Sequence, residues 1–169
     1  GDQRLAVPLI QHLENHPDSV EEEMVEALGD VGNPQAVPAL VGLLQSPRSL
    51  LRRAAAKALG RIGSSEAIAP LIAAAEEAGD PDLRRASIQA LRVLGANESG
   101  PVVFDSLFDP HPSVRIAAAE AVSELNMVEA LPYVRQALAY YQDEAVGEMV
   151  YALGCVGTRE DLPLMLQQV

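Results

Sequence analysis

A six-residue segment recurs five times along the chain at a nearly constant spacing. ALGDVG at 27–32 returns as ALGRIG at 58–63, and more divergent copies follow at 90–95, 121–126 and 152–157. The copies begin 31, 32, 31 and 31 residues apart. Self-similarity at a fixed period of this length is typical of proteins that stack one small structural unit. We therefore predict a repeat protein that works through the surface its units build together.

Each unit carries the pattern of two short helices. In the unit 50–81, apolar residues fall at i, i+4, i+8 and i+11 from Leu51, which is one face of a helix. Gly63 stands where a left-handed residue closes a helix, and Asn126, the next most tolerant residue type, takes that place in a later copy. A second helix is expected from about residue 65 to 78. Each unit is therefore a pair of antiparallel helices.

We predict an all-α fold, an α-α superhelix (solenoid) of about five two-helix repeats in a single domain over 1–169. The expected limits are a half unit at about 1–18, then 19–49, 50–81, 82–112, 113–143 and 144–169. Helix N-caps are expected at Ser19, Ser49, Asp80, Ser113 and Asp143, with Ser19 and Glu22 forming a capping box. Because the pattern begins and ends within a repeat, we expect the chain to be a fragment of a longer array.

The chain is acidic: 24 Asp and Glu against 12 Lys and Arg give a formal net charge of −12. Such a surface repels phosphate backbones and anionic lipid headgroups, so we expect neither a nucleic-acid partner nor binding to a membrane. Cys155 is the single cysteine, which excludes a disulfide within the chain and is typical of a reducing compartment. The sequence has no apolar run of membrane-spanning length and no signal-peptide pattern, so we expect a cytoplasmic protein.

The residues of the units resemble those of a known repeat class. LRRAAAKALGRIG at 51–63, followed by AIAPLI at 67–72, is similar to the short HEAT-like repeat of the phycobilisome-lyase type, and VRIAAAEAV at 114–122 repeats its centre. The resemblance covers essentially the whole chain. It implies HEAT-like repeats and relatives that include bilin lyase subunits, phycobilisome-turnover factors and scaffolds. Because kinship of fold seldom fixes activity, the function stays open.

The arginine that follows valine in the family's repeat has counterparts here. The slot is occupied by Arg52, Arg84 and Arg115. Glu21 and Val146 depart from the pattern in the first and last units. One interpretation is a structural ladder, in which these arginines bond to loop carbonyls and to Asp80 or Asp109 of the adjoining turn. The other is a ligand-binding role.

The sequence contains no pattern that carries catalysis or binds metal. It has no Gly-rich phosphate loop, nucleophile elbow or metal-ligand spacing. Its histidines, His12, His16 and His111, do not form the His-Glu doublets that the resemblance to the deoxyhypusine-hydroxylase branch would require for two irons. We expect no catalytic residue, no metal and no cofactor. Cys155 is either an incidental small residue or a thiol that relays or tethers a tetrapyrrole.

A basic cluster is expected on the inner surface of the array. The candidate partner-binding residues are Arg53, Lys57, Arg61, Arg85, Arg92 and Tyr151. The equivalent slots of the preceding unit hold the acidic residues Glu22, Glu26 and Asp30. The cluster is predicted to bind an acidic partner or a carboxylate, because Arg favours planar two-bond contacts. Salt bridges between neighbouring units are the alternative. Tyr151 is included because tyrosine is enriched at interface hot spots.

Two functional hypotheses follow from these patterns. The first is a non-catalytic scaffold or adaptor that binds another protein on the concave helix face, with an acidic protein as the candidate partner. The second, which the resemblance implies, is a subunit of a bilin lyase or a phycobilisome-turnover factor that acts on phycobiliproteins, with a bilin as ligand. The first is favoured because the repeat pattern is complete and lacks a catalytic constellation.

Overall fold

The computed structural model describes residues 6–16, 19–77 and 79–167, and these ranges contain helices and turns but no β-strand. The predicted all-α fold is confirmed. The helices group into two compact units, 1–94 and 95–169, each of which is described by itself. The predicted repeat limits stay a prediction, and the expected helix end at residue 78 lies outside the described residues.

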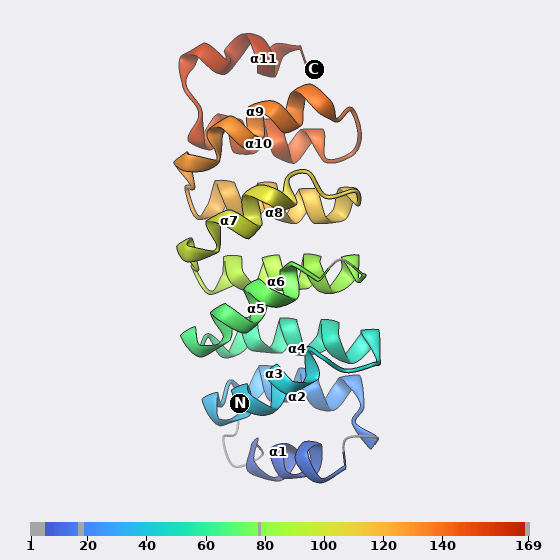
Figure 1. The fold of residues 1–169 in the computed structure, drawn as a ribbon. Helices are drawn as coiled ribbons and strands as arrows, with labels where there is room; N and C mark the ends of the chain where they lie inside the picture. The colour runs from blue at the N-terminus through green and yellow to red at the C-terminus, as the bar shows by residue number, and fades with distance from the viewer. Residues whose placement is uncertain (1–5, 17–18, 78, 168–169) are drawn as a thin grey trace. The chain divides into compact units, whose positions relative to one another are not determined.

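The first unit consists of two layers of helices (Figure 1). The first layer contains α2 (Glu22–Val31), α4 (Ser49–Ile62) and α6 (Pro81–Val93). The second layer contains α1 (Ala6–Asn15), α3 (Val37–Leu43) and α5 (Ile68–Ala75). Within the first layer α4 packs against α2 and α6, while α3 covers α4 and α5 covers α6. The core lies between the layers and is rich in alanine and leucine.

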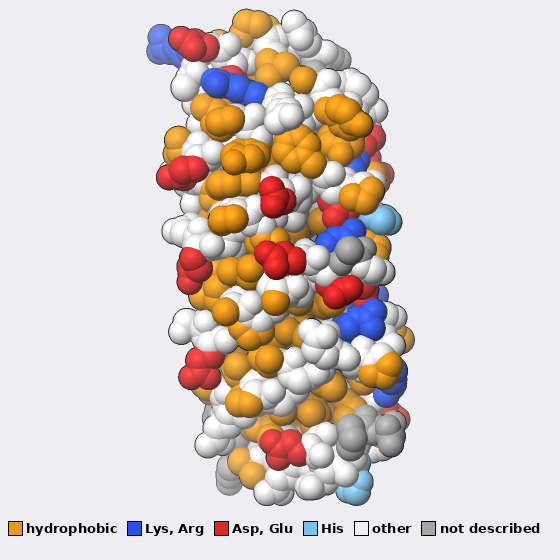
Figure 2. Space-filling view, viewed as in Figure 1, with side chains coloured by type: hydrophobic (Ala, Val, Ile, Leu, Met, Phe, Trp, Pro, Cys, Tyr) orange, Lys and Arg blue, Asp and Glu red, His pale blue; other side chains and the backbone are white. Residues whose placement is uncertain are grey.

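The second unit repeats this plan. Its first-layer helices are α8 (Pro112–Glu124) and α10 (Val146–Val156), which pack against each other. Its second-layer helices are α7 (Gly100–Ser106), α9 (Leu131–Tyr140) and α11 (Leu162–Leu166). Here α7 packs on α8 and α9 on α10. Figure 2 views the side of the second-layer helices, where hydrophobic side chains lie between scattered acidic ones.

The helix ends follow the repeat, as predicted. Gly63 closes α4 with φ 78°, and its N–H donates to the Leu59 carbonyl. Asn126, just beyond α8, has φ 49° and is the one non-glycine residue with positive φ in the described ranges. Left-handed backbone strains most side chains, so only Gly and Asn suit these positions. The second-layer helices α3, α5, α7, α9 and α11 begin differently, each after a short 3-10 turn such as Ser65–Ala67 before α5.

The predicted helix starts are right only in part. Asp80 does cap α6, since its carboxylate accepts the Leu83 N–H at 3.0 Å. Asp143 accepts the N–H of Ala145 at 3.0 Å, but the N-cap of α10 is Ala145, so Asp143 lies two residues too early to be the cap.

Three predicted caps are wrong. Ser49 and Ser113 lie inside α4 and α8, and before Ser113 a proline, with its preset φ, takes the first helical position. The capping box of Ser19 and Glu22 is also absent, because the Ser19 hydroxyl donates instead to the His16 carbonyl at 3.1 Å. Serine competes for nearby backbone groups in turns, so a cap motif alone did not locate these starts.

Small residues let the first-layer helices approach closely. A Cβ placed on Gly60 of α4 would lie 3.0 Å from the Cα of Ala90 on α6, and one on Gly29 of α2 would lie 2.8 Å from the Cα of Ala58. Ordinary Cβ contacts are 3.4–4 Å. Unlike Gly63, these two glycines lie within helices and act in packing.

We expect Gly60→Ala to lower the free energy of unfolding by about 1–3 kcal/mol, because the added methyl group meets backbone that has no room to move. Denaturation in urea measures the change. Gly42→Ala is the control: Gly42 is exposed on α3 with nothing within 4 Å of its Cβ position, so the substitution should stabilise by up to about 1 kcal/mol. Equal effects at the two positions would contradict the packing argument.

One buried hydroxyl in α6 has no hydrogen-bond partner among the described residues. Ser87 is 0% exposed, and its Oγ is unsatisfied. In the neighbouring repeats the equivalent position holds an alanine, at Ala55 and Ala118, and both are fully buried. The serine therefore places a polar atom where the repeat otherwise has a methyl group.

Ser87→Ala is expected to stabilise the protein by about 1 kcal/mol, since it removes an unsatisfied buried hydroxyl without opening a large cavity. Ser106→Ala should destabilise it instead, because the buried Ser106 hydroxyl donates to the Val102 carbonyl at 2.7 Å. Thermal unfolding of the two variants against wild type measures both signs. A loss of stability on Ser87→Ala would mean that its hydroxyl has a partner.

Candidate functional site

Three cations of the predicted cluster lie along α4. Arg53, Lys57 and Arg61 are four residues apart, so they share one side of the helix. Arg53 and Lys57 are half-buried, and Arg61 is exposed. The helical period thus places three positive charges in a row on the first layer of the first unit.

Two of these cations form ion pairs with α2. Arg53 Nη2 lies 3.1 Å from Glu22 Oε1, and Arg61 Nη1 lies 2.9 Å from Asp30 Oδ1. These two arginines therefore form the salt bridges between neighbouring repeats that the sequence analysis gave as the alternative to partner binding. The side chains of Arg61 and Asp30 are 44% and 70% exposed. A pair so solvated contributes only about 0–1 kcal/mol, so another carboxylate can replace Asp30 at little cost.

The row borders a hollow between α4 and α6 with a volume of about 290 Å³. Its lining residues are Lys57, Gly60, Arg61, Ala86, Gln89, Ala90, Arg92 and Val93. Three of the predicted site residues, Lys57, Arg61 and Arg92, thus come together at one depression. Its floor consists of small residues, and these are the ones through which the two helices approach.

The other two cations of the cluster do not line this hollow. Arg53 is held by Glu22, and Arg85 pairs within α6 with Asp82 at 2.9 Å. Gln89 and Val93 do line it, although sequence reasoning did not select them as site residues. The sequence does hold a signal for this recess, namely the small residues Gly60, Ala86 and Ala90 on the two facing helices. Small residues between longer polar side chains leave a depression.

Tyr151 and Cys155 lie one turn apart on α10, in the second unit. Tyr151 is 68% exposed, and the Cys155 thiol is free and exposed. Both side chains are therefore accessible on one helix. Partner binding by Tyr151 stays a prediction.

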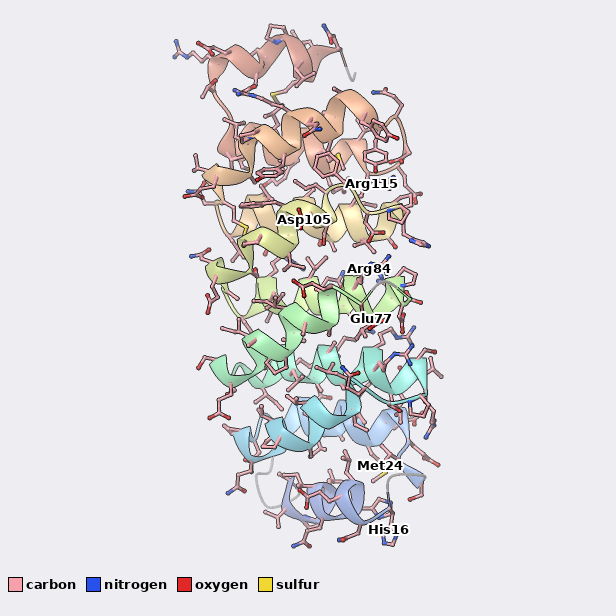
Figure 3. The ribbon with its side chains drawn as sticks, viewed as in Figure 1. His16, Met24, Glu77, Arg84, Asp105 and Arg115 are labelled. Carbon is pink, nitrogen blue, oxygen red and sulfur yellow. The ribbon has the colours of Figure 1, made fainter. Side chains whose placement is uncertain are left out.

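The family arginines form structural contacts. Arg52 donates to the Ser46 carbonyl at 2.8 Å and to the Asp80 carboxylate of the next turn, with Nε at 3.0 Å. Arg84, at the start of α6, donates to the Glu77 carbonyl at 2.9 Å (Figure 3). The predicted ladder of loop carbonyls and Asp80 is thus present in the first unit.

Arg115 occupies the same slot in the second unit, at the start of α8 (Figure 3). It is 1% exposed, donates to the Asp109 carbonyl at 2.5 Å, and forms an ion pair with Asp143. Its guanidinium also lies 4.0 Å from the centre of the Tyr141 ring, whose hydroxyl donates to the Phe108 carbonyl at 2.9 Å. An arginine enclosed in this way stabilises the fold and is out of reach of a ligand.

Two carboxylates that accept hydrogen bonds from arginines, Asp80 and Asp161, have lowered pKa values. Burial acts to raise the pKa of Asp80, but hydrogen bonds from Arg52 and from the Leu83 N–H hold it below its ordinary 3.8. Hydrogen bonds from Arg135 lower the pKa of Asp161 to about 2, against the effect of burial, and the Thr158 N–H adds to the lowering. Asp161 Oδ1 lies 2.5 Å from Arg135 Nε, and Asp161 Oδ2 lies 2.8 Å from the Thr158 nitrogen.

The histidines do not assemble into a metal centre. His12 Nε2 lies 3.0 Å from the Ser19 hydroxyl, and its ring is 5.0 Å from that of His16. His111 Nδ1 lies 3.4 Å from Asp109. Within the described ranges no three His, Cys, Asp or Glu side chains are grouped as metal ligands would be. None of the helices in those ranges has both the length and the apolar character of a membrane span.

The fold and this site define a helical-repeat protein with a basic recess between successive first-layer helices. A family model for HEAT repeats matches residues 6–92 and 68–154. The chain therefore belongs to the HEAT-repeat family, which confirms the predicted HEAT-like solenoid. No curated protein sequence matches the chain.

Several solved structures share this fold. The complex of CpcE and CpcF of phycocyanin lyase from Nostoc sp. PCC7120 aligns with 24% identity and a TM-score of 0.76, over 97% of this chain and 67% of that chain. Human deoxyhypusine hydroxylase aligns with 18% identity and a TM-score of 0.62, over 96% and 66% of the two chains. An engineered protein aligns with 18% identity and a TM-score of 0.66, over 96% and 84%. At these identities the similarity is one of fold.

The pair of Arg135 and Asp161 predicts a specific pH dependence. The folded-state pKa of Asp161 lies below its ordinary value, so its stabilising effect is present above pH 3.8 and is lost as the pH falls through about 2. Asp161→Asn should therefore be less stable than wild type at pH 7, with a difference that narrows between pH 4 and 2. Urea unfolding across this range measures the difference.

Arg135→Gln is the matching variant, because removing the guanidinium returns the pKa of Asp161 toward its ordinary value. The difference in stability between this variant and wild type should also become smaller between pH 4 and 2. A difference that stays constant from pH 7 to 2 in either variant would contradict this account of the pair.

Proposed function

We propose that this chain is a non-catalytic protein-interaction module whose α4–α6 surface binds an acidic segment of another protein. The hollow bordered by Lys57, Arg61 and Arg92 carries the proposal. In a chain with a net charge of −12, three cations around one recess concentrate positive potential at one place.

The chemistry of the recess suits a carboxylate on a protein. Arg61 and Arg92 offer planar donors for a carboxylate, Lys57 adds a point charge, and Gln89 can both donate and accept. The volume of about 290 Å³ accommodates an acidic side chain with part of its backbone. The net charge of −12 over the whole chain opposes a long polyanion such as a nucleic acid, so a short acidic stretch is the better match.

Lys57→Glu tests the proposal. Capture of partner proteins on immobilised protein, followed by mass spectrometry, identifies candidates, and titration with the purified candidate gives the affinity. We expect Lys57→Glu to weaken binding by at least about tenfold, since like charges placed in contact cost more than about 1.4 kcal/mol.

The control is Arg159→Glu, which makes the same change of charge at an exposed site before α11. It should leave affinity within about twofold of wild type. If both variants weaken binding equally, overall charge governs the interaction and the recess does not. If neither does, this face is not the binding surface.

A second candidate function is that of a bilin lyase subunit. It is supported by the similarity in fold to the CpcE and CpcF complex of phycocyanin lyase and by the exposed Cys155 beside Tyr151 on α10. In this case a bilin is the ligand and the thiol tethers it. Titration with phycocyanobilin should then shift its absorbance, and Cys155→Ser should remove the shift. An unchanged spectrum would count against this function.

A further inference from the structure

The second unit carries most of the net negative charge of the chain. Residues 95–169 contain 11 Asp and Glu and 3 Arg, with no Lys, which is −8 of the total −12. Two of the three arginines, Arg115 and Arg135, are in the ion pairs with Asp143 and Asp161 described above. Arg159 is the remaining cation. This unit therefore attracts cations, whereas the recess of the first unit attracts anions.

A second hollow, of about 430 Å³, lies in this acidic unit. It is formed by the turns that lead into α7 and α9. The lining residues are Asn97, Gly100, Pro101, Phe104, Leu125, Asn126, Met127 and Glu129. Its walls thus combine one carboxylate, two amides and one aromatic ring, which are the groups that hold an ammonium or a guanidinium.

The aromatic wall is held in place by its neighbours. The Phe104 ring stacks on Tyr133 with centroids 5.1 Å apart and planes 26° apart. It also folds over Gly100, where an added Cβ would lie 3.2 Å from the ring. Tyr133 is 39% exposed, so the stacked pair continues from the hollow to the surface. A cation placed against such rings gains from their electron-rich faces.

Exposed carboxylates lie on the turns and the helix that form the hollow. Glu129, exposed in the turn before α9, borders the hollow, and Glu98 is exposed in the turn before α7. Asp105, also exposed, follows Phe104 on α7 (Figure 3). The side of the second-layer helices shows this mixture of hydrophobic and acidic side chains (Figure 2).

We propose that this hollow is a second docking site, which takes a lysine or arginine side chain from a basic segment of a partner protein. The cation lies against Phe104 and pairs with Glu129, while its aliphatic stem covers Met127 and Leu125. The amide oxygens of Asn97 and Asn126 accept its remaining N–H groups. The site is in a different unit from the basic recess, and its partner has the opposite charge. The test of this site is therefore independent of the test of the function proposed above.

Binding of a short fluorescein-labelled peptide of alternating lysine and alanine tests the site by fluorescence anisotropy. The same peptide with every lysine acetylated keeps the length and backbone but lacks the charge. We expect the lysine peptide to bind at least about tenfold more tightly than the acetylated one. Equal binding of the two peptides, or no binding of either, would overturn the proposal.

Two variants locate the binding. Glu129→Gln removes the carboxylate, and Phe104→Leu keeps an apolar side chain but removes the ring. Each should weaken binding of the lysine peptide about threefold or more. Circular dichroism and thermal unfolding establish that each variant is folded. If Phe104→Leu fails to fold, Tyr133→Leu tests the same aromatic pair from its exposed side.

Glu144→Gln is the matched control, since it removes one exposed carboxylate of the same unit that does not line the hollow. It should leave binding of the lysine peptide within about twofold of wild type. An equal loss in Glu144→Gln and Glu129→Gln would mean that the peptide responds only to the overall charge of the unit, and the site would be refuted.

Discussion

The close contact between first-layer helices is the constraint on which the first unit depends. Gly60 and Ala90 allow the backbones of α4 and α6 to meet where larger side chains would separate them. The same two residues form the floor of the basic hollow, with longer polar side chains around them. Packing and site therefore have a common cause, because helices joined through small residues leave a recess beneath the side chains that flank them.

The repeat period made much of the fold predictable. It placed the helix pairs, the left-handed residues Gly63 and Asn126, and the cap at Asp80, because each follows from local backbone chemistry that recurs with the repeat. The repeat period did not locate the N-caps of α2 and α4, which were expected at Ser19 and Ser49. A serine hydroxyl can bond to several nearby backbone groups, and tertiary context decides which of them it takes.

The candidate site was only partly predictable. Helical spacing brought Arg53, Lys57 and Arg61 onto one face, and the repeat alignment indicated which acidic residues lie beside them. The hollow itself was missed, because its shape depends on how closely α4 and α6 approach. The hollow beside Phe104 in the second unit was missed for a similar reason, because it lies between two turns whose separation cannot be inferred from the sequence.

Asp80 links one repeat to the next in a way that bears on how the array loses its structure. Its carboxylate caps α6 and also accepts the guanidinium of Arg52, which belongs to the helix pair before it. Melting of either pair therefore removes a partner from the other. Neighbouring helix pairs that share contacts of this kind unfold together, so a chain built from them unfolds in cooperative groups of helices. The shared contacts of Asp80 thus add to the packing that couples these two helix pairs.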